Sequence, residues 1–158
     1  MPIEIERKFL VKNDAWRTDA SGTDYRQGYL SVDPQRSVRV RLSGQQAWLT
    51  VKGPAEGIAR MEFEYPIPVA DAEALLNLCL PTVIEKTRYI LELGKHCWEI
   101  DEFRGANDGL LLAEIELDDV NETFERPDWL GEEVTHDQRY YNATLSTNPY
   151  CRWKSDDL

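Results

Sequence analysis

Charged side chains stand at every second position in several strand-like segments of this chain. The first such segment is residues 3–9, IEIERKF, in which Glu4, Glu6 and Lys8 alternate with mostly apolar residues. Because successive side chains of a β-strand point to opposite faces, these three charges share one face of the strand. The pattern therefore predicts a sheet with one charged face and one mainly apolar face.

The alternation recurs along the chain in pairs of either sign. The pairs are Arg39 and Arg41, Glu62 and Glu64, Lys86 and Arg88, Glu99 and Asp101, and Glu114 and Glu116, with Lys52 in a similar run. One such pair alone would indicate a solvent-exposed strand face, because charged residues are mostly exposed. The whole set indicates acids and bases that meet on one surface, which lies inside the molecule if the sheet closes into a barrel.

Eight segments have the length and composition of strands. They lie near residues 3–11, 25–32, 37–44, 46–53, 59–68, 82–93, 96–103 and 110–118. Turn-forming residues such as Gly and Pro separate them, and eight strands suffice to close a barrel. We therefore predict a mainly β (α+β) fold, a closed eight-stranded antiparallel β-barrel with a few flanking helices.

Three helical segments complete the predicted fold. Residues 71–79 place apolar side chains on one helical face, with Asp71 as a candidate cap, and are expected to cover the outside of the barrel. Residues 119–126 and 137–147 are expected to form short helices joined by an irregular link. Three short helices are too few to cover all the apolar outer faces of a barrel. We therefore expect a second copy of the chain to cover some of the remainder, as a homodimer.

Length and charge limit the functional classes open to this chain. At 158 residues it fits one compact domain, which we place at residues 1–147, with a tail at 148–158 that is frayed or forms an arm. The formal net charge of −11 argues against general nucleic-acid binding, because neutralising phosphates needs a net basic surface.

The cysteines and the N-terminal sequence predict the compartment. Cys79, Cys97 and Cys151 are odd in number and form no CxxC pair, so neither a disulfide framework nor a thiolate zinc site is indicated. No apolar run resembles a signal peptide or reaches the length of a membrane-spanning helix. A membrane barrel also alternates, but the inserted helix and the charged lumen disfavour it. We expect a reducing, cytoplasmic setting and no membrane partner.

The sequence EIERK at 4–8 matches the ExExK motif of the CYTH superfamily, also called triphosphate tunnel metalloenzymes. From about residue 2 to about residue 147, the chain resembles small bacterial members of that family. The segments that carry the resemblance are RQGYL at 26–30, VRVRL at 38–42, LTVKG at 49–53, EFEYPI at 62–67, VIEKTRY at 83–89, EIDEF at 99–103, AEIEL at 113–117 and GEEVTHDQRYYNATL at 131–145.

This resemblance implies a barrel whose lumen binds a linear triphosphate and a divalent metal, Mg²⁺ or Mn²⁺. The implied metal ligands are Glu4, Glu6, Glu114 and Glu116. The implied phosphate-binding residues are Lys8, Arg39, Arg41, Lys52, Lys86 and Arg88. Near the acidic side, Glu62, Glu64 and Asp101 are implied as ligands, as groups that support ligands, or as groups that orient water.

The residue types suit that chemistry. Arginine binds phosphate oxygens with paired donors, and lysine supplies a compact charge. Carboxylates would repel a triphosphate unless they hold a hard cation such as Mg²⁺ or Mn²⁺. The inferred reaction is in-line attack of water on a terminal phosphorus, with pyrophosphate as the leaving group.

The catalytic group stays open at this point. Glu62, Glu64 or Asp101 would orient the attacking water, whereas Lys8 and Tyr29 form an alternative proton-handling pair. Tyr29 is at least as well interpreted as a packed aromatic whose hydroxyl is satisfied.

Arg139 and the histidines lie outside the alternating pattern. Arg139 either points into one mouth of the barrel and contacts phosphate, or forms an ion pair on a helix surface. His96 and His136 are isolated from other candidate ligands, so we assign them surface or packing roles.

The resembling family includes inorganic triphosphatases, thiamine triphosphatases, RNA triphosphatases and class IV adenylate cyclases. The compact chain has no added segment for reading a purine or an RNA end. We therefore favour hydrolysis of inorganic triphosphate (tripolyphosphate), then of thiamine triphosphate, then cyclisation of ATP. Outside the enzymes, the alternative is a polyphosphate- or nucleotide-binding module, which would not need so many acids in its lumen.

Overall fold

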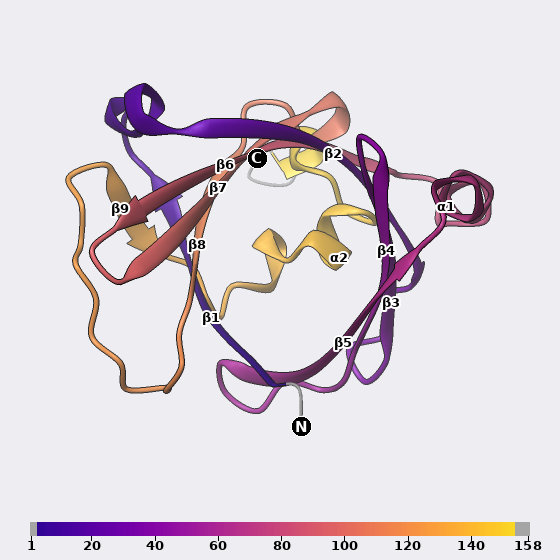
Figure 1. The fold of residues 1–158 in the computed structure, drawn as a ribbon, viewed down its shortest axis with the longest axis horizontal. Coiled ribbons are helices and arrows are strands. Elements are labelled where there is room, and N and C mark those ends of the chain that lie inside the picture. Colours follow the sequence, from indigo (N-terminus) through magenta and orange to yellow (C-terminus); the bar gives the residue numbers. More distant parts are fainter. Residues whose placement is uncertain (1–2, 154–158) are drawn as a thin grey trace.

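A computed structural model describes residues 3–153 of the chain as a closed β-barrel (Figure 1). Its strands are β1 (Ile3–Val11), β2 (Ser21–Ser31), β3 (Ser37–Ser43), β4 (Gln46–Lys52), β5 (Ala59–Ile67), β6 (Ile84–Leu93), β7 (His96–Arg104) and β8 (Leu111–Glu116). Around the barrel they run in the order β1-β5-β4-β3-β2-β6-β7-β8, and every pair is antiparallel. The predicted mainly β, eight-stranded barrel is confirmed.

Strand β1 closes the barrel because its two halves pair with different neighbours. Ile3 to Ile5 pair with β5, whereas Glu6 to Leu10 pair with β8. A ninth strand, β9 (Leu130–Glu133), adds to the last residues of β1. It lies in the segment from which we expected only an irregular link, since four residues are too few to show a strand pattern.

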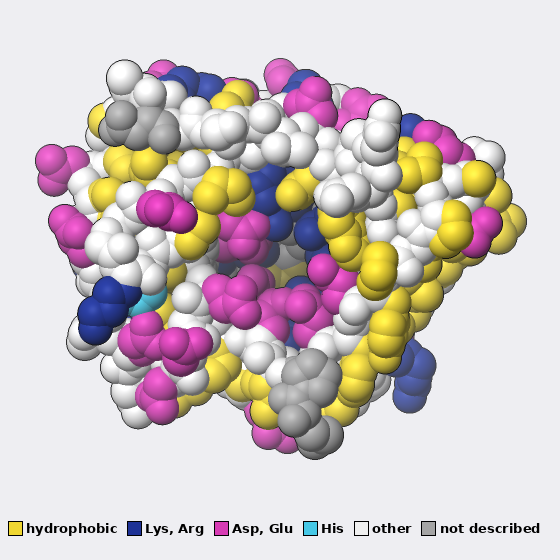
Figure 2. All heavy atoms as spheres, in the orientation of Figure 1, with side chains coloured by type: hydrophobic (Ala, Val, Ile, Leu, Met, Phe, Trp, Pro, Cys, Tyr) yellow, Lys and Arg dark blue, Asp and Glu magenta, His cyan; other side chains and the backbone are white. Residues whose placement is uncertain are grey.

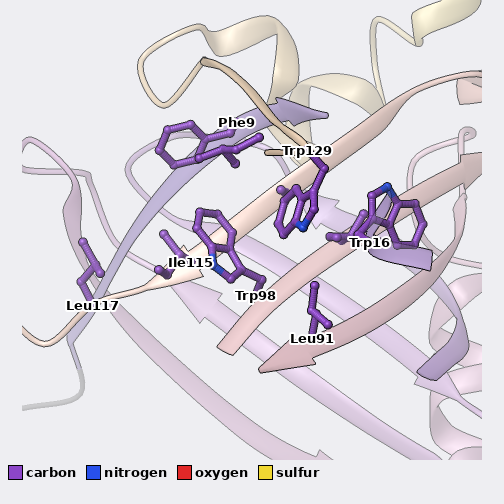
Figure 3. Close-up of a cluster of buried hydrophobic side chains, with 10 residues drawn as sticks. Phe9, Trp16, Leu91, Trp98, Ile115, Leu117 and Trp129 are labelled. Atoms are coloured by element: carbon purple, nitrogen blue, oxygen red, sulfur yellow. The ribbon is translucent and has the colours of Figure 1, made fainter. Parts of the chain in front are cut away.

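The outer side of β1, β6, β7 and β8 carries a large aromatic cluster (Figure 3). Phe9 packs edge to face on Trp98, with ring centroids 5.7 Å apart, and Trp98 packs in the same way on Trp129, at 5.3 Å. Trp16, from the 3₁₀ helix η1 (Ala15–Asp19), completes the cover over Leu91. Burial of such large side chains stabilises this side of the barrel by about 1.5–3 kcal/mol for each.

Residues 118–129 cover this cluster without forming the helix that we predicted at 119–126. Two side chains bond to the backbone instead. The backbone N–H of Asn121 donates to Asp119 Oδ1, and the backbone N–H of Asp118 donates to Glu122 Oε1. Such local bonds compete with helical hydrogen bonding, so the segment is held as a loop.

Helix α1 (Val69–Leu76) covers a second outer cluster over β3 and β4. The predicted helix therefore exists, although it begins two residues earlier and ends sooner. Its N-cap is Pro68, and Asp71 lies in the first turn without capping it. Gly28 permits the close approach of the following segment, because a Cβ there would lie 2.8 Å from Cys79 Sγ.

A third cluster fills one end of the barrel. Ile84, Phe103 and Leu112 are buried there, each two residues from an inward-facing charged residue on its strand. The C-terminal segment adds Leu145 and Trp153 to the same cluster. One end of the lumen is therefore packed with apolar side chains, while the charged positions lie beyond them.

That C-terminal segment is less helical than predicted. In place of one helix at 137–147, it forms η3 (Gln138–Tyr140) and α2 (Asn142–Leu145), followed by η4 (Tyr150–Arg152). Residues 154–158 of the predicted tail lie outside the described residues. Within residues 3–153, none of the helices has the length and hydropathy needed to cross a membrane.

Candidate active site

A cavity of about 650 Å³ occupies the lumen of the barrel. Its walls are mainly the inward-facing side chains of the strands, and loop residues within 32–35 and 54–58 and segment 135–144 also contribute. Figure 2 shows a hollow at the centre of one face of the molecule, where acidic and basic side chains gather. The charged faces predicted from the alternation therefore meet inside the barrel.

All six predicted phosphate-binding residues of the strands line this cavity. They are Lys8, Arg39, Arg41, Lys52, Lys86 and Arg88. Burial, together with the positive charges of Arg39 and Arg88, lowers the pKa of Arg41 from 12.5 to about 10. The Nε of Arg39 is buried and has no hydrogen-bond partner among the described residues. This crowding of cations suits an anion of high charge density.

Asp101 holds two of these cations in place. Its Oδ2 accepts from Lys86 Nζ at 2.7 Å, and its Oδ1 accepts from Arg88 Nε at 2.8 Å. Although burial opposes the shift, the charges of Arg88 and Lys86 hold the pKa of Asp101 far below its usual range. Asp101 is 1% exposed and is not among the cavity-lining residues, so the geometry favours a supporting role over contact with water.

The four predicted metal ligands also line the cavity, on neighbouring strands. Glu6 of β1 lies directly opposite Glu116 of β8, and Glu114 lies opposite Lys8. Burial and the charges of Glu114 and Glu4 raise the pKa of Glu6 well above its ordinary value. Burial alone would raise the pKa of Glu114, but the positive charges of Lys8 and Arg88 outweigh it and lower that pKa to about 2.

These carboxylates partly fit a divalent cation. Carboxylate oxygens are the ligands that Mg²⁺ and Mn²⁺ prefer, and the repulsion that raises the pKa of Glu6 is what a bound cation would relieve. Within residues 3–153, however, no three His, Cys, Asp or Glu side chains converge as a ready-made metal site. Mg²⁺ is usually held by one or two carboxylates, waters and substrate phosphates, so the donor set fits a metal that arrives with its substrate.

Glu62 and Glu64 line the cavity from β5, next to the basic side. Glu62 Oε2 lies 3.4 Å from Lys52 Nζ, which also donates to Glu4 Oε1 at 3.0 Å. Glu64 Oε2 accepts from Thr50 at 3.2 Å. Both carboxylates therefore lie where acidic and basic groups meet.

Lys8 and Tyr29, which we considered as a proton-handling pair, have different partners in the structure. Lys8 Nζ donates to Tyr140 O at 3.1 Å and lies 3.4 Å from Glu114 Oε1. Tyr29 lines the cavity but is 5% exposed and packs in the cluster at the closed end. Among the described residues, no hydrogen bond or cation–π contact joins these two side chains.

Arg139 and the two histidines lie away from the cavity lining. Arg139 is exposed, forms an ion pair with Asp137 and stacks on the rings of Tyr140 and Trp153. His96 bonds to Glu122 in the loop over the aromatic cluster, and His136 is exposed. The geometry of Arg139 matches the alternative of a surface ion pair.

The sequence analysis gave no role to several residues that line the cavity. Glu99 lines the cavity and pairs with Arg88, and Arg60 lines it from β5. The period of two already placed Glu99 on the charged face, and it would have added Arg60, which lies two positions before Glu62. Asn142 also lines the cavity, and no strand period could have indicated it because it lies on α2.

Comparisons with known proteins give a consistent result. The profile of the CYTH domain matches residues 2–147. An inorganic triphosphatase of Acetivibrio thermocellus is 51% identical over 152 residues, which cover 96% of this chain and 97% of that protein. An inorganic triphosphatase of Nitrosomonas europaea is 38% identical over 148 residues, which cover 90% and 96%.

A solved structure also matches. The crystal structure of an inorganic triphosphatase aligns with a TM-score of 0.65 and 35% identity, covering 90% of this chain and 96% of that chain. The similarity therefore extends over nearly the full length of both molecules.

Proposed function

Because this chain belongs to the CYTH domain family, we propose that it hydrolyses inorganic triphosphate to pyrophosphate and phosphate in the barrel lumen. The observation that carries the proposal is a cavity in the barrel lumen whose wall places seven cations beside a group of carboxylates. The proposal gains support from the two inorganic triphosphatases that match over almost their whole length.

In this proposal, the basic residues bind the phosphates and an acidic residue orients the attacking water. Arg39, Arg41, Lys86 and Arg88 would bind the phosphate oxygens, because all four side chains line the cavity. Fixed cations of this kind stabilise the charge that develops on the leaving pyrophosphate. Glu62 or Glu64 would orient the attacking water, since both lie at the border between the acidic and basic sides.

Glu4, Glu6, Glu114 and Glu116 would hold Mg²⁺ or Mn²⁺. When bound, such a cation neutralises phosphate charge and lowers the pKa of a water molecule. Without it, these carboxylates would repel the substrate that Lys8 and Lys52 attract.

We also propose a homodimer in a reducing, cytoplasmic setting. The outward-facing residues Val38, Val51 and Phe63 lie side by side on β3, β4 and β5, outside the three buried clusters of the described chain. Ile3 and Tyr65 add exposed apolar surface, each 56% exposed. A continuous apolar strip of this kind favours association with a second copy. The three free cysteines suit a reducing compartment.

Phosphate release from inorganic triphosphate tests the proposed reaction. The assay runs with Mg²⁺, with Mn²⁺ and with EDTA, beside thiamine triphosphate and ATP, and cyclic AMP is measured in the ATP reaction. We expect metal-dependent release chiefly from inorganic triphosphate. Preferred turnover of thiamine triphosphate, or formation of cyclic AMP, would replace the proposed substrate. Tight binding without any turnover would favour a binding module.

A further inference from the structure

Asn142 lies where the C-terminal segment meets the basic side of the cavity. Its Oδ1 accepts from Lys86 Nζ at 3.0 Å and from Gln27 Nε2 at 2.9 Å. Gln27 is fully buried, and its Oε1 accepts from Arg41 Nε at 3.2 Å. One amide pair therefore joins two cations that come from β3 and β6.

The hydrogen bonds fix the orientation of both amides. Arg41 Nε can only donate, so the oxygen of Gln27 must face it and the nitrogen of Gln27 must face Asn142. Asn142 then receives donors from two directions, which fixes its oxygen toward Gln27 and Lys86. A flipped Asn142 would place its NH₂ group against two donors and lose both bonds.

This orientation leaves the nitrogen of Asn142 for the cavity. Asn142 is a cavity-lining residue, and its Nδ2 has no hydrogen-bond partner among residues 3–153. Lys86 and Arg41 line the same cavity, and both are bonded to this amide pair. A donor in such a place matches an anionic oxygen acceptor.

We propose that Asn142 is a substrate-binding residue, whose Nδ2 donates to a phosphate oxygen while its Oδ1 positions Lys86 and, through Gln27, Arg41. The inference rests on the proposed triphosphatase function and deepens it. It makes α2 part of the binding site, so the C-terminal segment closes the barrel end and also recognises the substrate.

The experiment measures binding of inorganic triphosphate in EDTA by calorimetry, and kcat and KM with Mg²⁺. Asn142→Ala removes both functions of the amide. Asn142→Asp keeps an acceptor for Lys86 and Gln27, which preserves the anchoring of α2, but replaces the donor by an anionic oxygen. Asn121→Ala and Asn121→Asp are matched controls, because Asn121 is exposed in the loop on the outside of the barrel.

We expect both Asn142 variants to bind triphosphate about tenfold or more weakly, because a hydrogen bond to a charged group is lost. The rise in KM should exceed any fall in kcat, and the Asn121 variants should match the wild type. Thermal melting identifies a variant that has lost its fold. If Asn142→Asp stays folded and binds triphosphate within twofold of the wild type, Asn142 only anchors the segment and the inference is overturned. A wild-type protein that neither binds nor hydrolyses triphosphate would overturn the proposed function, and the inference with it.

Discussion

Lys86 is almost completely buried, with 1% of its surface exposed, and its protonation has opposite effects on binding and on stability. Burial lowers its pKa from 10.5 to about 7, although Asp101 opposes the shift. The charged amine is the form that attracts phosphate. Since the folded protein holds this proton less tightly than the unfolded chain, the contribution of Lys86 to stability rises with pH between about 7 and 10.5.

We therefore predict that kcat/KM for triphosphate falls as pH rises above about 7, because kcat/KM reports ionisation of the free enzyme. Lys86→Met should be less active and should lack this step. The pH profiles of both proteins, measured with the same metal, check the assignment. A profile with the same step in Lys86→Met would show that another group titrates.

The ionised form of Glu6 destabilises the folded protein when no metal is bound. Its charge lies among those of Glu114 and Glu4, and burial adds to the penalty. We predict that Glu6→Gln raises the melting temperature of the protein in EDTA by several degrees, since about 1 kcal/mol corresponds to about 2–4 °C in a domain of this size. The same variant should gain less stability from Mg²⁺ and should turn over triphosphate more slowly. An unchanged melting temperature in EDTA would mean that the charge of Glu6 does not destabilise the folded protein.

Among the elements, the C-terminal segment packs side chains into the closed end of the barrel. Leu145 is fully buried at the closed end, three residues after Asn142. Leu145→Ala should lower the free energy of unfolding by about 2–5 kcal/mol. It should also raise KM, because a looser α2 no longer holds Asn142 beside Lys86.

Leu91→Ala is the matched control for that prediction, since Leu91 is buried in the aromatic cluster on the outside of the barrel. It should destabilise the protein with little change in KM. Chemical denaturation and steady-state kinetics give both quantities. Equal rises in KM for the two variants would assign the effect to general destabilisation.

The strands could be predicted because a period of two is visible wherever one face is charged. Inward-facing Glu114 and outward-facing Ile115 differ by one position, so a slip in register would bury the wrong side of β8. The C-terminal elements could not be predicted in this way. Residues 137–147 resemble a helix locally, but the packing of Leu145 and the bonds of Asn142 inside the barrel decide their shape.

The candidate site was predictable to the same extent as the strands. The paired charges identified most of the cavity wall. Asp101 and Glu99 share the charged face of β7, and the sequence does not show that only Glu99 lines the cavity. That difference depends on the ion pairs of Asp101 with Lys86 and Arg88. Tyr29 and Arg139 likewise needed tertiary contacts. Sequence patterns give the face of a residue and not its distance from the cavity.

At the scale of the whole molecule, the apolar strip on β3, β4 and β5 predicts the assembly. Phe63→Glu places a charge in the strip, beside Val51 of β4 and two residues before the exposed Tyr65. We expect light scattering to show a dimer for the wild type and a monomer for this variant. Ile90→Glu, at an exposed position on β6, is the control and should remain dimeric. A monomeric wild type would contradict the proposed dimer.

The measurement that tests the central claim most directly is phosphate release from inorganic triphosphate with Mg²⁺ by the wild type and by Glu116→Gln. Glu116 lies in the cavity wall. The matched control is Glu125→Gln, which makes the same substitution at an exposed glutamate of the outer loop. We predict metal-dependent release by the wild type and by Glu125→Gln, and a fall of about a hundredfold or more in Glu116→Gln. Undiminished turnover in Glu116→Gln, or wild-type turnover that persists in EDTA, would contradict a metal-dependent active site inside the barrel.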